Sequence, residues 1–571
     1  MLRLFGTIGN NVPSDKPNDN FYDNYKDWKD VYYRISTCGL DSVNNFFTEE
    51  GGSIVVVQGN LFESANHKKP ANYILDLYNK KQDISFVRQL NGSFNFFLID
   101  KRNRLIYLAT DKCGSRPLFV YQKDNQLTFG SEIKLLLSLL NKHPAINWGA
   151  WGEYLTFRFT LGENTFYKDI RLIPNGTLFK ISYGDKTKIS EEQYWDFPEI
   201  ETDLDSSFEQ KIHEGTEIFK TIFQSLGDDI KDSINIVALS GGYDSRSIVS
   251  GLKKFSPSSK FDTVTTLHPA GSEKEIVNEL SEALKLKNKY IDRPTNIYKR
   301  FFIRKAYLSD CLVQEHLWTM PMLDTISQYN TYIDGIAGDI VMRSTRVRPI
   351  HIEKKDDTHF LVKLFKKQFG FDYIWLEDYI DPNIWNHIKF TDDWTSRELS
   401  KIPTTENRMM TFLIKNRVRN GISIAPNNII GNNVKMVIQP FFDDRLVRFG
   451  FSIPHKYKFK FIYREILNAA FPEIMSIPST SDENTDKLKS YDNRILQFDQ
   501  NPRELISDYS DISKEDTKYL FNLLRQLDFP SFINKQVFID DMKIDLKVNR
   551  INTILDIVLW YNMFEQNNLP I

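Results

Sequence analysis

Residues 240–245 read Ser-Gly-Gly-Tyr-Asp-Ser, and this short run combines residue types that could do chemistry. Glycines let a phosphate approach the backbone closely, and the N–H groups of a tight turn at the start of a helix point toward such an anion. No lysine follows the glycines, so the run is not a G-x-x-x-x-G-K-[ST] phosphate loop. The run predicts a phosphate-binding turn, and the alternative is a Gly-Gly turn that holds no ligand.

The residues on either side of this run indicate the elements that position it. Ile236–Leu239 is a short apolar run typical of a strand that is buried on both faces. Ile248, Val249 and Leu252 then follow at helical spacing. This strand, turn and helix start resemble the loop that grips pyrophosphate in ATP pyrophosphatases, which cleave ATP between its α and β phosphates to make an adenylate.

Composition excludes several classes of protein. The chain has 571 residues, enough for more than one domain, and its 41% of hydrophobic residues can fill sizeable cores. A formal net charge of −2 does not favour a nucleic-acid binder or a polybasic membrane surface. Cys38, Cys113 and Cys311 imply neither a disulfide framework nor a metal site. Since no signal-peptide pattern and no membrane-spanning run is found, we expect a cytoplasmic protein.

Strand and helix patterns divide the chain into two halves. Residues 1–200 carry short β-type runs separated by turn signals, which predict the layered sheets of an α+β domain. These runs are Ser53–Gln58, Ser93–Ile99, Leu105–Ala109, Leu127–Gly130 and Gly176–Ser182. Helical periodicity dominates residues 205–571 and predicts a doubly wound α/β domain with a parallel sheet and extra helices. Its expected strands are Ile234–Leu239, Thr263–Leu267 and Tyr332–Ile336. The polar, acidic stretch 196–208 is expected to link the halves.

Segments taken in order resemble one family across essentially the whole chain. In the first half these segments are MLRLFGTIG, VVVQGNLF, GSFNFFLID, ATDKCGSRPLFVY, FGSEIKLLL, FTLGENTFYKDIRLIPNG and YWDF. In the second half, the Gly-Gly run is followed by IDGIAGDIV, IQPFFDDRLV and KFKFIYREIL. They are similar to the two domains of the asparagine synthetase superfamily. The resemblance implies a glutamine-amidotransferase-like domain of the N-terminal-nucleophile-hydrolase type over 1–200, and an ATP-pyrophosphatase synthetase domain over 205–571.

The first half departs from the family pattern at the positions that hydrolyse glutamine. Active glutaminases of the family begin Met-Cys, and the freed cysteine attacks the amide with its own α-amine as base. Here position 2 is Leu2. The family's Asn-Gly oxyanion pair is replaced by Gln58-Gly59, and its RGPD segment is absent around residues 33–34. We therefore expect a degenerate, structural domain that does not hydrolyse glutamine.

The second half matches the family's ATP site. The resemblance assigns Mg²⁺ binding to Asp244 and Asp339, because pyrophosphate is a highly charged leaving group and hard oxygen ligands suit Mg²⁺. It assigns to Lys460 the stabilisation of charge on the adenylate and on the tetrahedral intermediate. The alternative for Lys460 is a solvated lysine in the basic cluster that it forms with Lys456 and Lys458. ATP and Mg²⁺ are thus the implied cofactors. The residues that match the family's ATP-binding loops are Leu239, Ser240, Gly241, Gly242, Asp244, Ser245 and Gly335.

One departure in the second half bears on the nucleophile. Asparagine synthetases usually read Gly-Glu-Gly-x-Asp-Glu where residues 335–340 read Gly-Ile-Ala-Gly-Asp-Ile. Ile336 and Ile340 replace the two acidic companions, which suits a site that no longer receives ammonia. In this the chain resembles two groups of relatives that use an amine of the substrate itself, the β-lactam synthetases and the lasso-peptide cyclases. Holding the amine beside the adenylate makes the attack unimolecular.

The resemblance therefore implies an ATP-dependent, AMP-forming carbon–nitrogen ligase that closes its acid substrate into a ring. Ile336 stands where β-lactam synthetases carry a tyrosine, so their Tyr–Glu dyad is not matched. The Lys- and aromatic-rich region 353–378 and the tail 551–566, with Trp560, favour a lasso-peptide macrolactam synthetase. Its substrate would be a precursor peptide, prepared by a leader-processing protease, or a small molecule. The alternatives are an ammonia-using asparagine synthetase, another small-molecule amide ligase and a non-catalytic scaffold protein.

Overall fold

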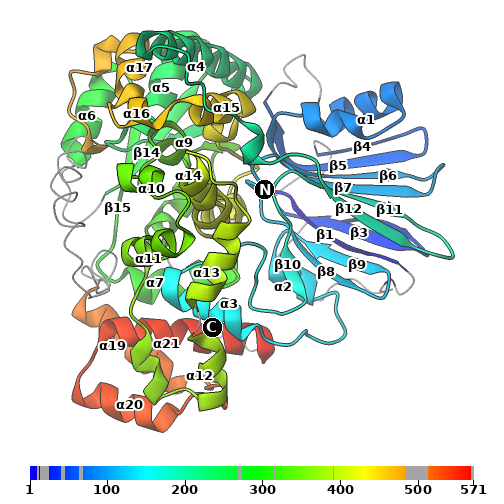
Figure 1. Cartoon of the computed structure of the whole chain (residues 1–571), viewed down its shortest axis with the longest axis vertical. Coiled ribbons are helices and arrows are strands. Elements are labelled where there is room, and N and C mark those ends of the chain that lie inside the picture. The colour runs from blue at the N-terminus through cyan, green and yellow to red at the C-terminus, as the bar shows by residue number, and fades with distance from the viewer. Residues whose placement is uncertain are drawn as a thin grey trace.

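The computed structural model describes residues 1–9, 12, 25–39, 46–62, 69–267, 273–313, 316–389, 391–481 and 512–566. Stacked antiparallel sheets lie on one side of the molecule, and a parallel sheet covered by helices lies on the other (Figure 1). The fold class predicted from the sequence is confirmed, with layered antiparallel sheets in the N-terminal part and a parallel sheet in the C-terminal part. Within the described ranges, no helix is long and apolar enough to cross a membrane.

The N-terminal part is a sandwich of two sheets, each with six strands in the described residues, in the orders β10-β8-β9-β1-β3-β2 and β12-β11-β7-β6-β5-β4. The first sheet comprises β1 (Arg3–Ile8), β2 (Lys26–Asp30), β3 (Tyr33–Cys38), β8 (Phe119–Lys123), β9 (Gln126–Gly130) and β10 (Ile170–Leu172). The second comprises β4 (Phe47–Glu50), β5 (Ser53–Leu61), β6 (Gly92–Asp100), β7 (Leu105–Thr110), β11 (Thr177–Ser182) and β12 (Lys188–Gln193).

Side-chain alternation along the strands explains this layering. Val56 and Phe97 of the second sheet pack with Phe129 of the first in the core between the sheets. Their neighbours Val55 and Phe96 point the other way, into the core that continues under the helices of the C-terminal part. Both faces of the central strands β5 and β6 of the second sheet are therefore buried. The helices of this half are α1 (Pro70–Lys81), α2 (Ile133–Leu137) and α3 (Trp148–Phe157).

The C-terminal part is built on a parallel sheet with the strand order β15-β14-β13-β16-β17. Its strands are β13 (Asn235–Ala238), β14 (Phe261–Leu267), β15 (Asn288–Asp292), β16 (Thr331–Ile333) and β17 (Met436–Ile438). The helices around it are α4 (Phe208–Ile230), α5 (Tyr243–Phe255), α6 (Glu273–Ala283), α7 (Ile297–Leu308), α8 (Leu323–Ile326), α9 (Gly338–Arg343), α15 (Asp444–Ser452), α16 (His455–Lys458) and α17 (Ile462–Ala470). The long helix α4 begins where Ser207 and Gln210 form a reciprocal capping box.

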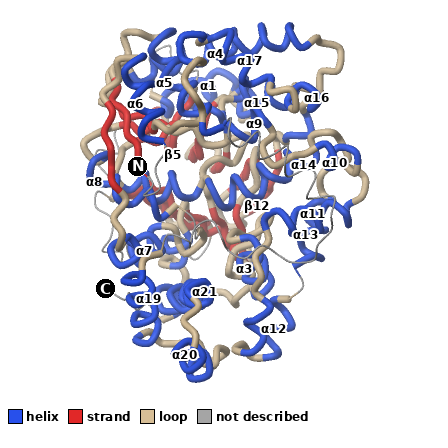
Figure 2. Tube along the Cα trace, turned by 90° about the vertical axis from the view of Figure 1, so that its left-hand side faces the viewer, coloured by secondary structure: helices blue, strands red, loops and turns tan. Residues whose placement is uncertain are grey.

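The helices of residues 382–388 and 514–560 lie at the opposite end of the molecule from α4 and α17, with the strands between them (Figure 2). The helices of the C-terminal part outside the parallel sheet are α10 (Pro349–Glu353), α11 (Thr358–Phe369), α12 (Pro382–Ile388), α13 (Thr391–Ser400), α14 (Arg408–Leu413), α19 (Lys514–Gln526), α20 (Lys535–Ile544) and α21 (Val548–Trp560). Trp151 of α3 stacks on Phe166 at 4.0 Å between ring centres and meets Trp560 of α21 edge-on at 5.2 Å. The tail of the chain is thus packed against the N-terminal half.

A π-helical segment also joins the two halves. Ile414–Ile422 and Ala425–Ile429 are π-helical, a form that is rare in proteins. The buried amide of Asn420 donates to the carbonyl of Thr160 at 2.8 Å and to that of Gly162 at 3.0 Å. Since a buried carbonyl needs a partner, the two halves satisfy each other's hydrogen bonds here.

Candidate functional site

The Gly-Gly turn lies where the strand order of the parallel sheet reverses. The chain passes from β13 to β14 and β15 on one side, and then returns to β16 on the other side of β13. In doubly wound sheets, ligands bind in the crevice that opens at the carboxyl ends of the strands at such a reversal. The turn follows β13 and leads into α5, with Gly242 as the N-cap residue. Residues 240–245 therefore occupy the place of a ligand-binding loop.

Hydrogen bonds within the loop fix its shape. Ser245 Oγ accepts from the N–H of Ser240 at 2.9 Å, and Ser240 Oγ accepts from the N–H of Gly242 at 3.3 Å. Leu239 has its side chain buried, and its N–H donates to the carbonyl of Val264 on β14 at 2.9 Å. Of the residues predicted to bind ATP, Leu239 thus ties the loop to the sheet, and the small residues after it form the turn.

Residues 474–481 hold the loop in place, and this segment was missed by the sequence analysis. The N–H of Thr480 donates to the carbonyl of Gly241 at 3.1 Å. Arg246, which is fully buried, donates to the carbonyl of Pro478 at 2.6 Å. A side chain at Gly241 would place its Cβ 2.8 Å from the Thr480 methyl group, so this close approach requires glycine. The segment carries no motif that marks such a role, and its contacts lie more than 200 residues away in the chain.

Asp244 and Asp339, the two predicted Mg²⁺ ligands, lie side by side next to this loop. The N–H of Asp339 donates to the Asp244 carboxylate. Burial raises the pKa of Asp244, the positive charge of Arg343 opposes that rise, and the negative charge of Asp339 adds to it. Asp244 Oδ1 is buried and has no hydrogen-bond partner among the described residues. Gly335 and Gly338 permit this packing, since Cβ atoms there would lie 3.0 and 2.6 Å from Asp244 atoms.

This pair of carboxylates fits Mg²⁺. A cation would satisfy the unpartnered Oδ1 and remove the like-charge repulsion that acts on Asp244. The described part of the chain holds no cluster of three or more His, Cys, Asp or Glu side chains that could bind a metal on their own. A site with two protein carboxylates leaves the other ligand positions to water and to substrate phosphates, which is the way Mg²⁺ is commonly held beside nucleotides.

The segment before Asp339 corrects one prediction. The expected strand Tyr332–Ile336 ends at Ile333, because Ala337 turns the chain into α9 with a left-handed φ of 73°. Gly335 is consequently a loop residue that faces Asp244. Asp334 is a further acidic residue at this edge that the sequence analysis did not select. Burial raises the pKa of Asp334 to about 6.

The three lysines of the KFKFIYREIL region lie in different surroundings. Lys458 is buried, because α16 turns it inward, and its Nζ lies 3.2 Å from Met410 Sδ, so the three lysines do not share one solvated cluster. Burial lowers the pKa of Lys458 to about 7. Lys456 and Lys460 are exposed. Lys460 stands just before Phe461, a bulky residue held at a left-handed φ of 60°.

Helix α17 starts beside the acidic pair. Tyr463, in its first turn, is buried and places its hydroxyl 3.3 Å from Ser247 Oγ. Ser247 Oγ in turn donates to the carbonyl of Asp244 at 2.8 Å. The structure therefore brings the region of Lys460 next to the loop, although no hydrogen bond or ion pair of the Lys460 ammonium is found within the described ranges.

The PFFDD segment connects the site to the N-terminal half. Phe441 lies beneath the acidic pair, 2.9 Å from the position of a Cβ at Gly338. The amide of Asn91 donates to Asp443 at 3.1 Å and accepts from the N–H of Asp444 at 2.8 Å. The two acids of this segment therefore hold the halves together and lie outside the crevice.

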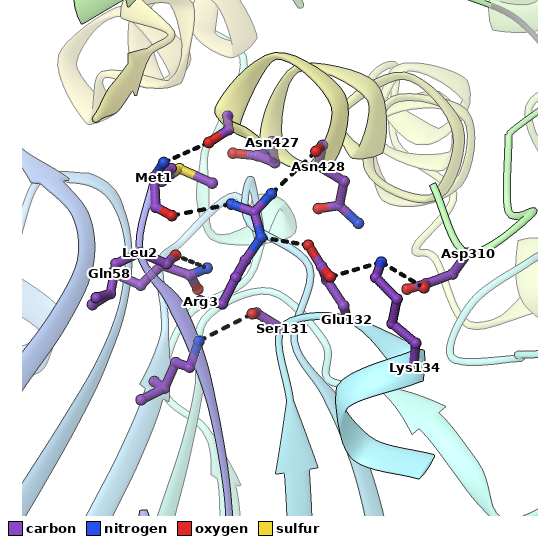
Figure 3. A network of polar contacts seen from close by, with 12 residues as sticks. Met1, Leu2, Arg3, Gln58, Ser131, Glu132, Lys134, Asp310, Asn427 and Asn428 are labelled. Atoms are coloured by element: carbon purple, nitrogen blue, oxygen red, sulfur yellow. Dashed lines mark hydrogen bonds and ion pairs between the residues drawn. The ribbon is translucent and has the colours of Figure 1, made fainter. Parts of the chain in front are cut away.

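The first residues of the chain are buried against the C-terminal half (Figure 3). The α-ammonium of Met1 donates to the carbonyls of Gly431 and Val434. The Leu2 side chain belongs to the core between the sheets, and its carbonyl accepts from Gln58 Nε2 at 3.0 Å. Both predicted departures, Leu2 and Gln58, thus serve packing and backbone hydrogen bonding in this structure.

A chain of buried charges continues from these residues across the interface (Figure 3). Arg3 donates to the carboxylate of Glu132 and to the carbonyl of Asn428, the latter at 3.1 Å. Glu132 pairs with Lys134 at 2.7 Å, and Lys134 pairs with Asp310 at 3.0 Å. Each charge has an oppositely charged neighbour, which offsets the cost of burying it. The network fixes how the two halves meet.

Comparisons with known proteins relate the chain to one family. A family model described as a glutamine amidotransferase domain matches residues 58–195, a range that leaves Leu2 outside. A protein of Methanocaldococcus jannaschii named as a candidate glutamine-hydrolysing asparagine synthetase 2 is 28% identical over 228 residues, which cover 37% of this chain and 42% of the relative. The glutamine-hydrolysing asparagine synthetase 1 of Bacillus subtilis is 27% identical over 201 residues, or 35% of this chain and 30% of the relative.

A third relative carries a different name. Amidase chry2 of Gibberella zeae is 25% identical over 236 residues, which cover 38% of this chain and 33% of the relative. All three matches span less than half the length of the relative concerned.

Proposed function

Because the chain belongs to the asparagine synthetase superfamily, we propose that it is an ATP-dependent ligase that forms an amide bond through an acyl adenylate. The position of Asp244 is the observation that supports this proposal most directly. Its unpartnered buried oxygen lies beside Asp339 and the Gly-Gly turn, at the reversal of the strand order. A loop of backbone N–H groups with two adjacent carboxylates suits a nucleoside triphosphate that carries Mg²⁺.

The reaction would have two steps. In the first, a carboxylate oxygen of the substrate attacks the α-phosphorus of ATP, the bond to the β-phosphate oxygen breaks, and pyrophosphate leaves. The backbone N–H groups of residues 240–245 would hold that leaving group, and Asp244 and Asp339 would hold Mg²⁺, which when bound neutralises phosphate charge. In the second, an amine attacks the acyl carbon, AMP leaves and the amine loses a proton. Lys460 would stabilise negative charge in both steps.

We propose that the amine belongs to the acid substrate, so that the product is a ring, most directly the macrolactam of a lasso peptide whose precursor a protease has prepared. Ile340 is fully buried and Ile336 packs against the same core, so neither position offers an acidic group to an incoming ammonia. Leu2 offers no nucleophile that could release ammonia from glutamine. A tethered amine needs no such supply, and its effective concentration reaches about 10⁵ M or more when it is well oriented. We place the reaction in the cytoplasm.

The second candidate is an ammonia-using asparagine synthetase, which the names of two relatives favour. Mass spectrometry separates the candidates in a reaction with candidate peptides or aspartate, ATP, Mg²⁺ and ¹⁵N-ammonium. A product lighter by one water and free of ¹⁵N supports ring closure. Incorporation of ¹⁵N into an aspartate-derived amide supports the second candidate.

Exchange of labelled pyrophosphate into ATP tests the first step. The wild-type protein should support exchange with its acid substrate, and Asp244→Asn and Asp339→Asn should abolish it. Asp232→Asn, at an exposed position, is the matched control and should exchange like the wild type. Absence of both exchange and Mg·ATP binding in the wild type would overturn the ligase proposal and leave a scaffold protein.

We also propose that the N-terminal half does not hydrolyse glutamine. The purified protein is incubated with glutamine, and glutamate is measured. Release of about one glutamate per protein molecule per second or more, an ordinary enzymatic rate, would overturn this part of the proposal.

A further inference from the structure

A guanidinium beside the acidic pair lacks an acceptor. Arg343 lies on α9 one turn after Asp339, and its Cζ lies 5.8 Å from the centre of the Tyr243 ring. Its positive charge acts on both Asp244 and Tyr463. Arg343 Nε is buried without a hydrogen-bond partner, and no hydrogen bond or ion pair of this guanidinium is found in the described part of the chain.

A role in the fold alone does not explain this arrangement of Arg343. A buried N–H without an acceptor costs free energy, and a charged donor costs more than a neutral one. Arg246 also has a buried Nε with no hydrogen-bond partner among the described residues, but its terminal nitrogens donate to the carbonyls of Ile477 at 2.8 Å and Pro478 at 2.6 Å. Arg343 has only the face of Tyr243 beside it among these contacts, and its charge acts on Asp244 next to the Gly-Gly turn.

We propose that Arg343 binds the β- and γ-phosphates of ATP, and the pyrophosphate that the first step releases. This inference rests on the proposed function. The pair Asp244 and Asp339 would repel polyphosphate, and the charge that Arg343 brings beside Asp244 offsets that repulsion in the protein itself. A planar guanidinium donates two parallel N–H bonds to a phosphate, a geometry that an ammonium cannot reproduce.

Calorimetric titration of the full-length protein with Mg·ATP, Mg·pyrophosphate and AMP tests the proposal without knowledge of the acid substrate. Arg343→Met keeps a stem of similar length against Tyr243 and removes the charge. We expect it to weaken pyrophosphate and ATP binding about tenfold or more, the scale of a hydrogen bond to a charged group, and to leave AMP binding unchanged. Arg346→Ala, three residues on and exposed, should bind all three ligands like the wild type.

Two outcomes separate this inference from the function on which it rests. If the wild type binds neither Mg·ATP nor Mg·pyrophosphate, the proposed function fails and the inference fails with it. If the wild type binds both and Arg343→Met binds them equally well, only the inference is overturned, and Arg343 serves the fold alone. Should Arg343→Met not fold, Arg343→Lys decides: weaker pyrophosphate binding supports a two-bond contact, and wild-type affinity overturns it.

Discussion

The hydroxyl of Tyr463 donates a hydrogen bond to Ser247 Oγ at 3.3 Å, and this bond joins the first turn of α17 to the start of α5, just after the loop that follows β13. Lys460 lies in the segment immediately before that turn. The contact therefore ties the segment that carries the lysine to the helix that carries Asp244. Ser247 Oγ in turn donates to the carbonyl of Asp244 at 2.8 Å, and Asp244 Oδ1 has no partner among the described residues.

Tyr463→Phe should weaken Mg·ATP binding severalfold, because the start of α5, which carries Asp244, loses the hydrogen bond that ties it to α17. The free energy of unfolding should fall by about 1 kcal/mol, the usual net value of one hydrogen bond. Calorimetry and urea unfolding measure the two effects. Tyr457→Phe removes a similar bond, from its hydroxyl to the carbonyl of Ser206 at 3.0 Å, away from the site. If both variants bind Mg·ATP alike, the contact between Tyr463 and Ser247 has no role in binding.

Lys460→Ala should slow amide formation about 10²–10³ fold, the effect of removing one donor that stabilises developing charge. Mg·ATP affinity should stay close to that of the wild type. Lys456→Ala is the matched control because Lys456 is also exposed and lies in the same segment. Equal rates for the two variants would show that Lys460 is an ordinary surface lysine.

Lys458→Met should stabilise the protein at neutral pH. The pKa of Lys458 is about 7 in the folded protein and near 10.5 in an unfolded chain, so the unfolded state binds the proton more tightly. The free energy of unfolding therefore rises as pH increases from 7 to 10.5, and methionine removes this slope. The slope is measured as the difference between the midpoints of thermal unfolding at pH 7 and pH 9.5. Lys456→Met, at an exposed position, is the control. A lower midpoint at pH 7 would contradict the expectation.

Glu153 gives a pH dependence of the opposite sign. It is fully buried in α3 and accepts from the N–H of Leu161 at 2.8 Å and from the amide of Asn164 at 2.7 Å. Burial raises its pKa to about 8 from 4.5, and the charge of Glu398 adds to the rise while Lys401 opposes it.

The folded protein thus binds this proton more tightly than the unfolded chain does, and stability falls as pH rises from 4.5 to 8. Glu153→Gln should remove a loss of about 5 kcal/mol across that range. Thermal unfolding at pH 5 and pH 8 gives the comparison. Glu163→Gln, at an exposed ion pair with Arg171, should behave like the wild type. A wild-type slope in Glu153→Gln would show that other groups cause it.

Ala337→Gly should stabilise the protein by roughly 0.5–1 kcal/mol. Alanine is strained at a left-handed φ of 73°, and glycine adopts it freely at some cost in unfolded-state entropy. Ala337→Val should destabilise by about 1–2 kcal/mol or more, because a β-branched side chain suits that conformation least. Denaturant unfolding ranks the three proteins. The reverse order would mean that packing around α9 outweighs backbone strain.

Local patterns were sufficient to predict the layers and the loop. Runs such as Ser53–Gln58 and Thr263–Leu267 are strands because they are rich in β-branched residues, whose side chains pack well on a pleated sheet. Short strands left no such signal. Met436–Ile438 is too short for an alternation of buried and exposed side chains to be recognised in the sequence. It is a strand only because β16 lies beside it. The expected end of β16 was wrong because one left-handed residue, Ala337, decides where the chain turns.

The parts of the site that the sequence did not reveal depend on contacts between distant segments. Whether a lysine in a run of alternating lysines is buried is decided by its surroundings, and Lys458 is buried against Met410 of another helix. Likewise, Arg246 looks like any helix arginine, yet it binds the backbone of residues 477–478. Asp244 was predictable because its role is local, in the turn itself.

Because the chain is synthesised from its N-terminus, the π-helical segment affects how the N-terminal half folds on the ribosome. Asn420 donates to the carbonyl of Thr160, and Asn427 to that of Ser115, over separations of 260 and 312 residues. On the ribosome the N-terminal sandwich emerges long before residues 420 and 427 are synthesised. Until then the carbonyls of Thr160 and Ser115 must hydrogen-bond to water. Nascent chains arrested before residue 420 should accordingly be cut by protease near residues 160–162, and chains arrested once residues 414–429 have emerged should be protected there.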